Sequence, residues 1–196
     1  MPTRQAAAGL CLAAILAACD RDSSDADSTD WASYMRGSWS GPCLVAEGRG
    51  TQTRWIFNDE VFVQIVTRSP NENCTGPSQI ETTTGGVSAA GDNPRAPAAL
   101  DLFPGTTSVL PTTAEAAQAL NDADTCKAVF AAGSRTAVNP EKCAQGTALF
   151  TAPRYEFAQF IDRVMFFSKR TDSETGQSPE TRPRSIDPDV IYTKDP

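Results

Sequence analysis

The chain contains no histidine among its 196 residues. This absence excludes serine–histidine triads, histidine-ligated zinc centres and imidazole pH switches, because each of them needs an imidazole side chain. The G-x-S-x-G and S-x-x-K patterns that mark activated serine nucleophiles are also missing. Glu156 and Asp162 could face each other across a cleft, but surface solvation explains both carboxylates more simply. We therefore expect no catalytic residues, no cofactor and no metal site.

Positive charge and long apolar runs are scarce as well. Lysine and arginine total 17 against 24 aspartates and glutamates, which leaves a net charge of −7. A chain with this balance lacks the basic surface that binds a phosphate backbone, so nucleic acid is not an expected partner. The apolar run at 6–18 is too short to span a bilayer as a stable helix.

The N-terminal segment instead has the features of an export signal. Arg4 precedes the apolar run, and small residues end it. The tetrapeptide LAAC at positions 16–19 resembles the lipobox of bacterial lipoproteins, whose cysteine is acylated and becomes the mature N-terminus. We expect residues 1–18 to be a lipoprotein signal peptide and Cys19 to carry the lipid. The alternative is an ordinary signal peptide with a chance cysteine.

An acidic stretch follows the lipobox. Residues 19–30 contain five aspartates and almost nothing to bury, which predicts a solvated, disordered tether. The spacing of these aspartates lacks the glycine and distal glutamate of an EF-hand, so a calcium loop is the weaker interpretation. We expect an exported protein, anchored to a membrane of the cell envelope and facing the periplasm. Asp20 is an inner-membrane retention signal in some Gram-negative bacteria, and the choice between inner and outer membrane stays open.

Four cysteines remain once Cys11 is removed with the signal peptide and Cys19 is acylated. They are Cys43, Cys74, Cys126 and Cys143. An even number of cysteines in an exported chain predicts disulfides, and three pairings are possible. Metal binding is the rival interpretation, but the chain has neither a C-x-x-C pair nor a histidine to support it.

Alternation of apolar and polar residues dominates the rest of the chain. It predicts short strands over 53–57, 61–66, 79–84, 87–90, 98–103, 106–110, 154–161 and 164–167. Polar links at 58–60 and 162–163 predict hairpins, and Gly85-Gly86 predicts a break between two strands. This pattern indicates an all-β, mainly antiparallel barrel or sandwich that forms a single domain over 31–196.

One segment has helical character. Thr112 and Glu115 have the spacing of a capping box, residues 114–120 favour helix, and Asn121 can close it. We expect one short helix there. From about residue 170 the chain is polar and rich in proline, which predicts an extended C-terminal strap over the domain.

Several short motifs follow one another in a defined order along the domain. They are Gly37-Ser38-Trp39, Cys43, Thr53-Arg54-x-x-Phe57, Asn73-Cys74-Thr75-x-Pro77, the segment 109–121, Cys126, Cys143, Tyr155-Glu156, RVMFF at 163–167 and SPETRP at 178–183. From about residue 36 to 193 this order resembles one domain of the adenomatosis-polyposis-coli-down-regulated family. Members of that family are animal membrane glycoproteins that antagonise Wnt signalling.

The resemblance implies a lipocalin-like antiparallel β-barrel or half-barrel with an apolar interior that can take a lipid or acyl chain. This chain has one such domain rather than two, and a predicted lipid anchor in place of a transmembrane helix. It therefore looks like a single-domain bacterial lipoprotein version, and the Wnt partner is not transferred to it.

We expect the ligand to contact alternating strand residues and one cation. They are Trp39, Arg54, Trp55, Phe57, Val63, Ile65, Phe157 and Phe167. The apolar members would point inward, either lining a cavity or filling the core. Arg54 would meet a carboxylate or headgroup at the rim, or else pair with Glu60 or Glu81 on the strand surface. Arg182 has the same ambiguity between a headgroup contact and a strap pinned to the barrel.

A second function fits the same sequence. A non-catalytic protein-binding module of the cell envelope would use exposed loops, such as 85–97 or 127–146, to contact a protein partner. Substitutions in these loops would then abolish binding, whereas changes that fill the barrel would not.

Overall fold

The computed structural model describes residues 31–91, 93, 96–144 and 148–196. The expected signal peptide, the tether and Cys19 lie outside the described residues. The strands are β1 (Gly37–Ala46), β2 (Arg49–Asn58), β3 (Val61–Ser69), β4 (Gln79–Ala90), β5 (Ala98–Pro111), β6 (Thr136–Val138), β7 (Arg154–Ile161), β8 (Val164–Ser168) and β9 (Ile186–Lys194). The helices are α1 (Trp31–Met35) and α2 (Ala114–Asp122), with single 3₁₀ turns η1 (Thr125–Lys127), η2 (Pro140–Lys142) and η3 (Pro179–Thr181).

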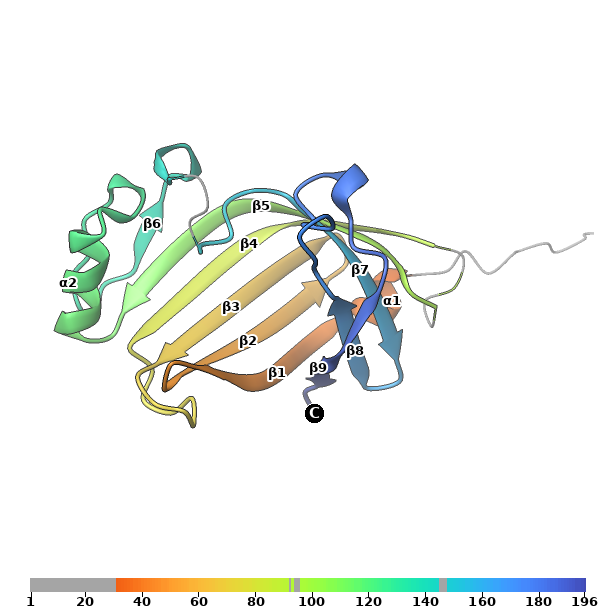
Figure 1. Cartoon of the computed structure of the whole chain (residues 1–196), viewed down its shortest axis with the longest axis horizontal. Coiled ribbons are helices and arrows are strands. Elements are labelled where there is room, and N and C mark those ends of the chain that lie inside the picture. The colour runs from red at the N-terminus through yellow and green to blue at the C-terminus, as the bar shows by residue number, and fades with distance from the viewer. Residues whose placement is uncertain (1–30, 92, 94–95, 145–147) are drawn as a thin grey trace, which may run out of the picture.

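Eight of these strands close into an antiparallel barrel. Their order is β4-β3-β2-β1-β9-β8-β7-β5, and β5 pairs back with β4. The N-terminal half of β5 pairs with β7, whereas its C-terminal half pairs with β6 outside the barrel. In Figure 1, β7, β8 and β9 lie over one end of the curved sheet β1–β5, and α2 and β6 lie at the other end. The predicted all-β barrel is confirmed.

Both hairpins expected from polar links are present. β2 pairs with β3 across Asp59 and Glu60, and β7 pairs with β8 across Asp162 and Arg163. Asp59 and Asp162 adopt left-handed backbone angles, with φ of 51° and 52°. Aspartate tolerates this conformation better than most residues, which explains how these two-residue turns form without glycine.

The predicted strand break at Gly85-Gly86 is wrong, because β4 runs through it. The predicted division of 98–110 into two strands around Pro104-Gly105 is wrong as well, because β5 runs through those residues. The two sites lie opposite each other, and the register shifts between Thr84 and Gly85. A Cβ atom on Gly85 would lie only 2.1 Å from the carbonyl oxygen of Phe103. Glycine is thus required for close approach of the paired strands at a bulge, and it does not end the strand.

The predicted helix is confirmed as α2, but its cap is Thr113 and not Thr112. The Thr113 hydroxyl accepts a hydrogen bond from the Ala116 amide at 3.2 Å. The Thr112 hydroxyl donates instead to the carbonyl of Pro77. Helix α1 was not predicted from the sequence, and its Trp31 and Met35 are buried against the barrel.

The C-terminal segment does more than cross the surface as a strap. Residues 186–194 form β9, which pairs with β1 and β8 and so completes the barrel. The loop before it is held by Arg182, which contacts the Asp101 carboxylate at 2.6 Å and donates to the Glu156 carbonyl at 3.0 Å. Arg182 therefore pins this loop to β5 and β7.

Two apolar cores support the fold. The larger fills the barrel end where β7–β9 cover the sheet, and it consists mainly of aromatic side chains. The smaller lies beneath α2 and includes Val109, Ala117, Phe130, Val138 and Leu149. The candidate site lies next to the larger core, on the inner face of the barrel.

Candidate functional site in the barrel interior

Four of the predicted ligand-contacting residues point into the barrel and belong to its aromatic core. Trp39, Trp55, Phe57 and Phe167 are only 0–9% exposed. The rings of Trp55 and Phe167 lie 5.2 Å apart between centroids, and Trp39 lies 5.4 Å from Phe160 in an edge-to-face arrangement. Such packing is typical of aromatic cores. These rings pack together at the closed end of the barrel, and Trp55 and Phe167 also border a cavity.

The prediction that Val63, Ile65 and Phe157 point inward is wrong. On β3 the buried side chains are Phe62 and Gln64, so the residues between them lie on the outer face of the strand. On β7 the buried positions are 156, 158 and 160, which places Phe157 outside as well. The phase of the alternation differs by one residue from the expected phase, and one residue reverses the face.

Arg54 also lies on the outer face. Its guanidinium contacts the Asp195 carboxylate at 2.8 Å and donates to the Ser38 hydroxyl at 2.6 Å. Hydrogen bonds from Ser38 and Ser40, together with Arg54, lower the pKa of Asp195. Arg54 thus ties β2 to Asp195 near the C-terminus. The alternative prediction placed Arg54 on the strand surface, which is correct, but paired it with Glu60 or Glu81, which is wrong.

A cavity of about 230 Å³ opens beside the aromatic core, where β2 and β3 face β7, β8 and β9. Its lining combines ring faces with polar and charged groups. The lining residues are Thr53, Trp55, Gln64, Arg154, Glu156, Phe167, Ser168, Arg170, Asp187, Val190 and Tyr192. The volume lies just below the range of about 300–1,000 Å³ that holds drug-sized ligands, so the cavity fits a smaller molecule.

One carboxylate in this lining already has hydrogen-bond partners within the protein. Glu156 is buried, and it accepts hydrogen bonds from the Ser168 hydroxyl at 2.5 Å and from the Arg170 guanidinium. Charge-assisted hydrogen bonds of this kind offset much of the cost of burying a carboxylate. The pair Glu156–Arg170 therefore leaves little net charge on that wall.

Arg154 differs from Arg170 in having no anionic partner. Its guanidinium lies 4.1 Å from the centroid of the Phe150 ring. Among the described residues, no ion pair or hydrogen bond of its side chain occurs within normal contact limits. Burial and the nearby charge of Arg170 lower the pKa of Arg154, and the charges of Glu156 and Glu81 offset only part of this shift. Arginine still remains protonated in proteins, so a partly buried cation faces the cavity.

Two neutral groups complete the polar side of the cavity. The indole Nε1 of Trp55 is buried and has no hydrogen-bond partner of normal geometry. Tyr192 lies close enough to Trp55 and Thr53 for both to influence its hydroxyl, although burial is the larger effect and raises the pKa of Tyr192. A buried donor without a partner carries a desolvation cost, and a bound acceptor would remove it.

A second charged set lies further along the same inner face. Glu81 is buried on β4 and accepts from Arg68 Nε at 2.6 Å and from Gln79 Nε2 at 2.7 Å. Arg68 and Gln79 also border a wider groove of about 780 Å³ between the strand ends and α2. The α2 wall of this groove is made of small apolar side chains, such as Ala116 and Ala119.

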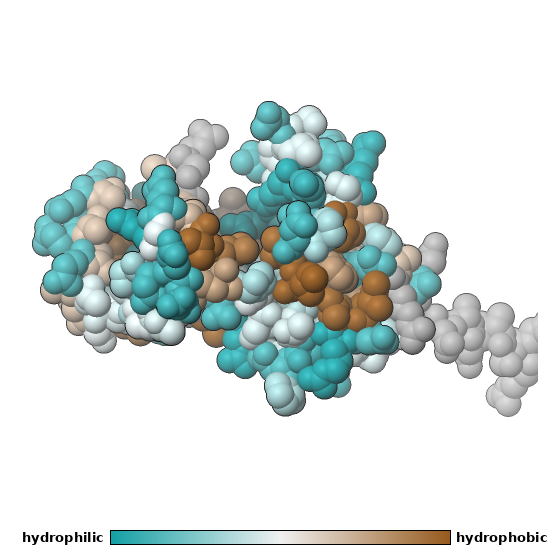
Figure 2. Space-filling model, turned by 60° about the horizontal axis from the view of Figure 1, so that its bottom comes forward, coloured by the Kyte–Doolittle hydropathy of each residue, from teal (hydrophilic) through white to brown (hydrophobic). Residues whose placement is uncertain are grey.

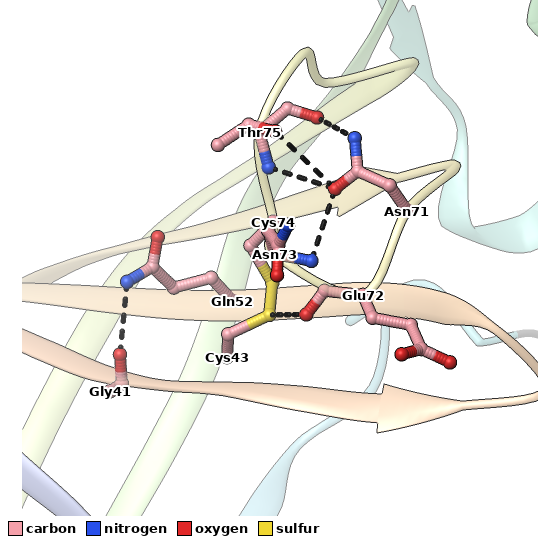
Figure 3. The surroundings of a disulfide bond; sticks show 8 residues. All are labelled: Gly41, Cys43, Gln52, Asn71, Glu72, Asn73, Cys74 and Thr75. Carbon is pink, nitrogen blue, oxygen red and sulfur yellow. Dashed lines mark hydrogen bonds between the residues drawn. A yellow bond between two sulfur atoms is a disulfide. The ribbon is translucent and has the colours of Figure 1, made fainter.

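Both disulfides were predicted without a pairing, and the structure joins Cys43 to Cys74 and Cys126 to Cys143. Figure 3 shows the first one, beside a loop in which the Asn71 side chain accepts from the Thr75 amide at 3.2 Å and donates to its carbonyl at 2.7 Å. A Cβ atom on Gly50 would lie 2.7 Å from Cys74 Sγ, so glycine makes room for this bond. The disulfides indicate an oxidising, exported environment.

Sequence reasoning missed most of the cavity's polar lining. Arg154 and Glu156 lie four and two residues before Ala158 on one strand face, and Ala158 and Phe160 are buried. Alternation counted back from the apolar end of this strand would have placed both charged residues inside. Tyr192 gave no comparable signal, because its segment was expected to be a strap.

The described ranges contain no helix that is both long and apolar enough for a membrane crossing. Within the same ranges, no three histidine, cysteine, aspartate or glutamate side chains gather as a metal site would require. Comparison of the sequence with protein-family models and with curated proteins gave no match. The resemblance to the adenomatosis-polyposis-coli-down-regulated family therefore stays a prediction.

Proposed function

We propose that this protein is a membrane-anchored lipoprotein whose β-barrel binds a small ligand with an apolar or acyl part in its interior cavity. The observation that carries this proposal is the cavity of about 230 Å³ where the rings of Trp55 and Phe167 meet unsatisfied polar groups. Concave sites with apolar walls and a few polar groups are the usual form of ligand sites. Acylation of Cys19, with the domain in the periplasm, would place the site next to a membrane.

The aromatic core limits the size of the apolar part. A lipocalin-like pocket would hold a long acyl tail, but here packed rings occupy the closed end and leave no space for one. A short chain of about six CH₂ groups would contribute about 5 kcal/mol on burial, a dissociation constant not far below about 1 mM. Tighter binding requires polar contacts in addition.

A ligand-retention experiment tests the proposal. The full chain carrying Cys19→Ser, which cannot be acylated, is purified and its small-molecule content is measured by native mass spectrometry and solvent extraction. We expect a small bound molecule, or uptake of added octanoate. Thr53→Phe, which fills the cavity from β2, should abolish uptake, whereas Ile65→Phe on the outer face of β3 should not.

Equal uptake by the two phenylalanine variants, or no uptake by the unsubstituted barrel, would contradict the proposal. Circular dichroism and thermal unfolding would show that both variants remain folded, since each adds one ring to the same sheet. Val63→Phe is a further outer-face control, because Val63 lies on the same face as Ile65.

The protein-binding alternative keeps one observation in its favour. Val129, within the 127–146 segment, is 83% exposed, so this loop presents an apolar side chain that a protein partner could cover. Crosslinking in cells followed by capture would test it. Loss of a captured protein with Val129→Ser, and its retention with Thr53→Phe, would favour the alternative over the cavity.

A further inference from the structure

The unpaired guanidinium of Arg154 narrows the class of ligand, and this step rests on the proposed function. We infer that the ligand carries a carboxylate and that Arg154 binds it inside the barrel. The inference comes from three features of the cavity wall: the charge of Arg154, the pairing of its neighbours, and a set of donors that includes Trp55 and Tyr192.

The first feature is a charge without a direct ion pair, because Glu156 and Glu81 act on Arg154 only from beyond ion-pair distance. A partly buried cation is costly in a protein interior unless an anion or several acceptors stabilise it. Stacking on Phe150 orients the guanidinium plane but supplies no acceptor. A ligand carboxylate would supply two oxygens in the geometry that the guanidinium fork matches.

The second feature is that neighbouring charges are already paired. Arg170 is bound to Glu156, and Arg68 is bound to Glu81, so neither guanidinium competes for a ligand anion. Asp187 borders the cavity on β9, and it accepts from the Asp189 amide. Of the two cations in the described lining, Arg154 is the one without an anion.

The third feature is a set of donors on the same wall. Among the described residues, the Trp55 Nε1–H has no partner of normal hydrogen-bond geometry, and the Tyr192 hydroxyl is its polar neighbour. Burial raises the pKa of Tyr192, so this hydroxyl stays a neutral donor. These groups and Arg154 come from β2, β9 and β7, three strands that surround one cavity. Convergent donors from separate strands are the arrangement that recognises an anionic oxygen.

Two other surfaces of the molecule give weaker support for a ligand site. The groove beside α2 is larger, but of its two cations Arg68 is already held by Glu81 and Arg49 is exposed to solvent. Apolar residues on the face shown in Figure 2 gather in separate brown areas with polar residues between them, so this face offers no continuous apolar surface. The acid-binding cavity is therefore the inference that the structure supports furthest.

Paired probes that differ only in their head group test the inference. Octanoate, octan-1-ol and octyl phosphate are titrated into the full chain carrying Cys19→Ser and followed by calorimetry and native mass spectrometry. We expect octanoate to bind at least about 10-fold more tightly than octan-1-ol, because only the acid pairs with the buried cation. Octyl phosphate should bind less tightly than octanoate, since a doubly charged head would leave excess charge in the cavity.

Variants of Arg154 then assign the effect. Arg154→Gln should weaken octanoate binding by about 30-fold or more and leave octan-1-ol binding unchanged. Arg154→Lys keeps the charge without the fork, and it should recover part of the loss. Arg54→Gln, on the outer face of β2, is the matched control and should change neither affinity.

The outcomes separate the two proposals. If octanoate and octan-1-ol bind equally, or if Arg154→Gln weakens both to the same extent, the carboxylate inference fails while the ligand-binding barrel stands. Tighter binding of octyl phosphate than octanoate also overturns it. If no probe binds and Thr53→Phe changes nothing, the proposed function fails and the inference fails with it.

Discussion

The two halves of the barrel interior are built on the same strands but differ in what they bury. At the closed end, Trp39, Phe57, Phe62 and Phe160 are at most 1% exposed. The rings of Trp39 and Phe57 both pack on Phe160, and Phe62 packs on Trp55. A few positions along the same inner faces, the side chains become Thr53, Gln64, Arg154 and Glu156. Apolar packing stabilises a fold at little risk, whereas buried charges cost stability unless each one is paired. The comparison separates the half that holds the barrel together from the half that is available for binding.

The closed end should be the most sensitive to truncation. Trp39→Ala removes a fully buried ring and the hydrogen bond from its indole to the Met35 carbonyl. We expect it to lower the free energy of unfolding by about 3–5 kcal/mol in urea titrations. Val61→Ala, at an exposed strand position, should change it by less than about 0.5 kcal/mol. Similar losses for both would mean that the rings do not form a packed core.

Removing either disulfide should cost about 3 kcal/mol. The bonds join residues separated by 31 and 17 positions, and the entropy of closing a loop grows only slowly with its length. The two disulfides should differ in which part of the chain becomes less protected from amide exchange. Paired serine substitutions at Cys126 and Cys143 should raise amide exchange around α2, and those at Cys43 and Cys74 should raise it at the ends of β1 and β2. Exchange that rises uniformly along the barrel in both cases would show that the two regions unfold as one unit.

Within the charged half, Arg170 and Arg154 should respond in opposite directions. Arg170→Met leaves the buried Glu156 carboxylate without its cation, and we expect a loss of about 2 kcal/mol, less than for a fully buried pair because Arg170 is partly exposed. Additional deletion of the carboxylate, in Arg170→Met with Glu156→Gln, should recover part of this loss. No recovery would mean that the pair does not act as a unit.

Arg154→Met should instead stabilise the ligand-free barrel by about 1 kcal/mol, because it removes a partly buried cation that lacks an anion. Calorimetric unfolding of the variant without added ligand measures this change. A clear destabilisation would show that stacking on Phe150 outweighs the cost of burying the charge. Gain of stability with loss of octanoate binding would be the signature of a binding residue.

The smallest effect should appear at alkaline pH. Burial raises the pKa of Tyr192 above its ordinary value of 10.0, so the folded chain holds this proton more tightly than the unfolded chain. The resulting stability is fully present below about pH 10 and is lost as the pH rises through the folded-state pKa. Tyr192→Phe lacks this loss. Urea titrations at about pH 8 and about pH 11 should therefore show that the unsubstituted protein loses stability relative to Tyr192→Phe at the higher pH.

Hairpin positions, the helix and the presence of disulfides could be predicted because each depends on residues close in the sequence. Asp59-Glu60 and Asp162-Arg163 are short polar turns between apolar runs, and Thr113 caps its own helix. The assignment of faces was less secure. On β3 both Val63 and its neighbour Phe62 are apolar, so alternation alone does not say which of them points inward.

The candidate site could be predicted only in its aromatic half. Trp55 and Phe167 were expected to face the interior, and they border the cavity. Arg154 was not expected there, because charged strand residues usually face solvent. Its inward position follows from the register of β5 with β7, in which Leu102 is the partner of Arg154. No local pattern shows that pairing.

The order of residues alone was enough to predict an export signal, which stays a prediction, together with an all-β fold and four cysteines available for pairing, since these depend on local chemistry. Barrel closure by β9, the cysteine partners and the meeting of Arg154 with Trp55 and Tyr192 were decided by the tertiary structure. The reason is physical: strands distant in sequence are matched by packing of whole faces, and each face is chosen by the burial of its neighbours.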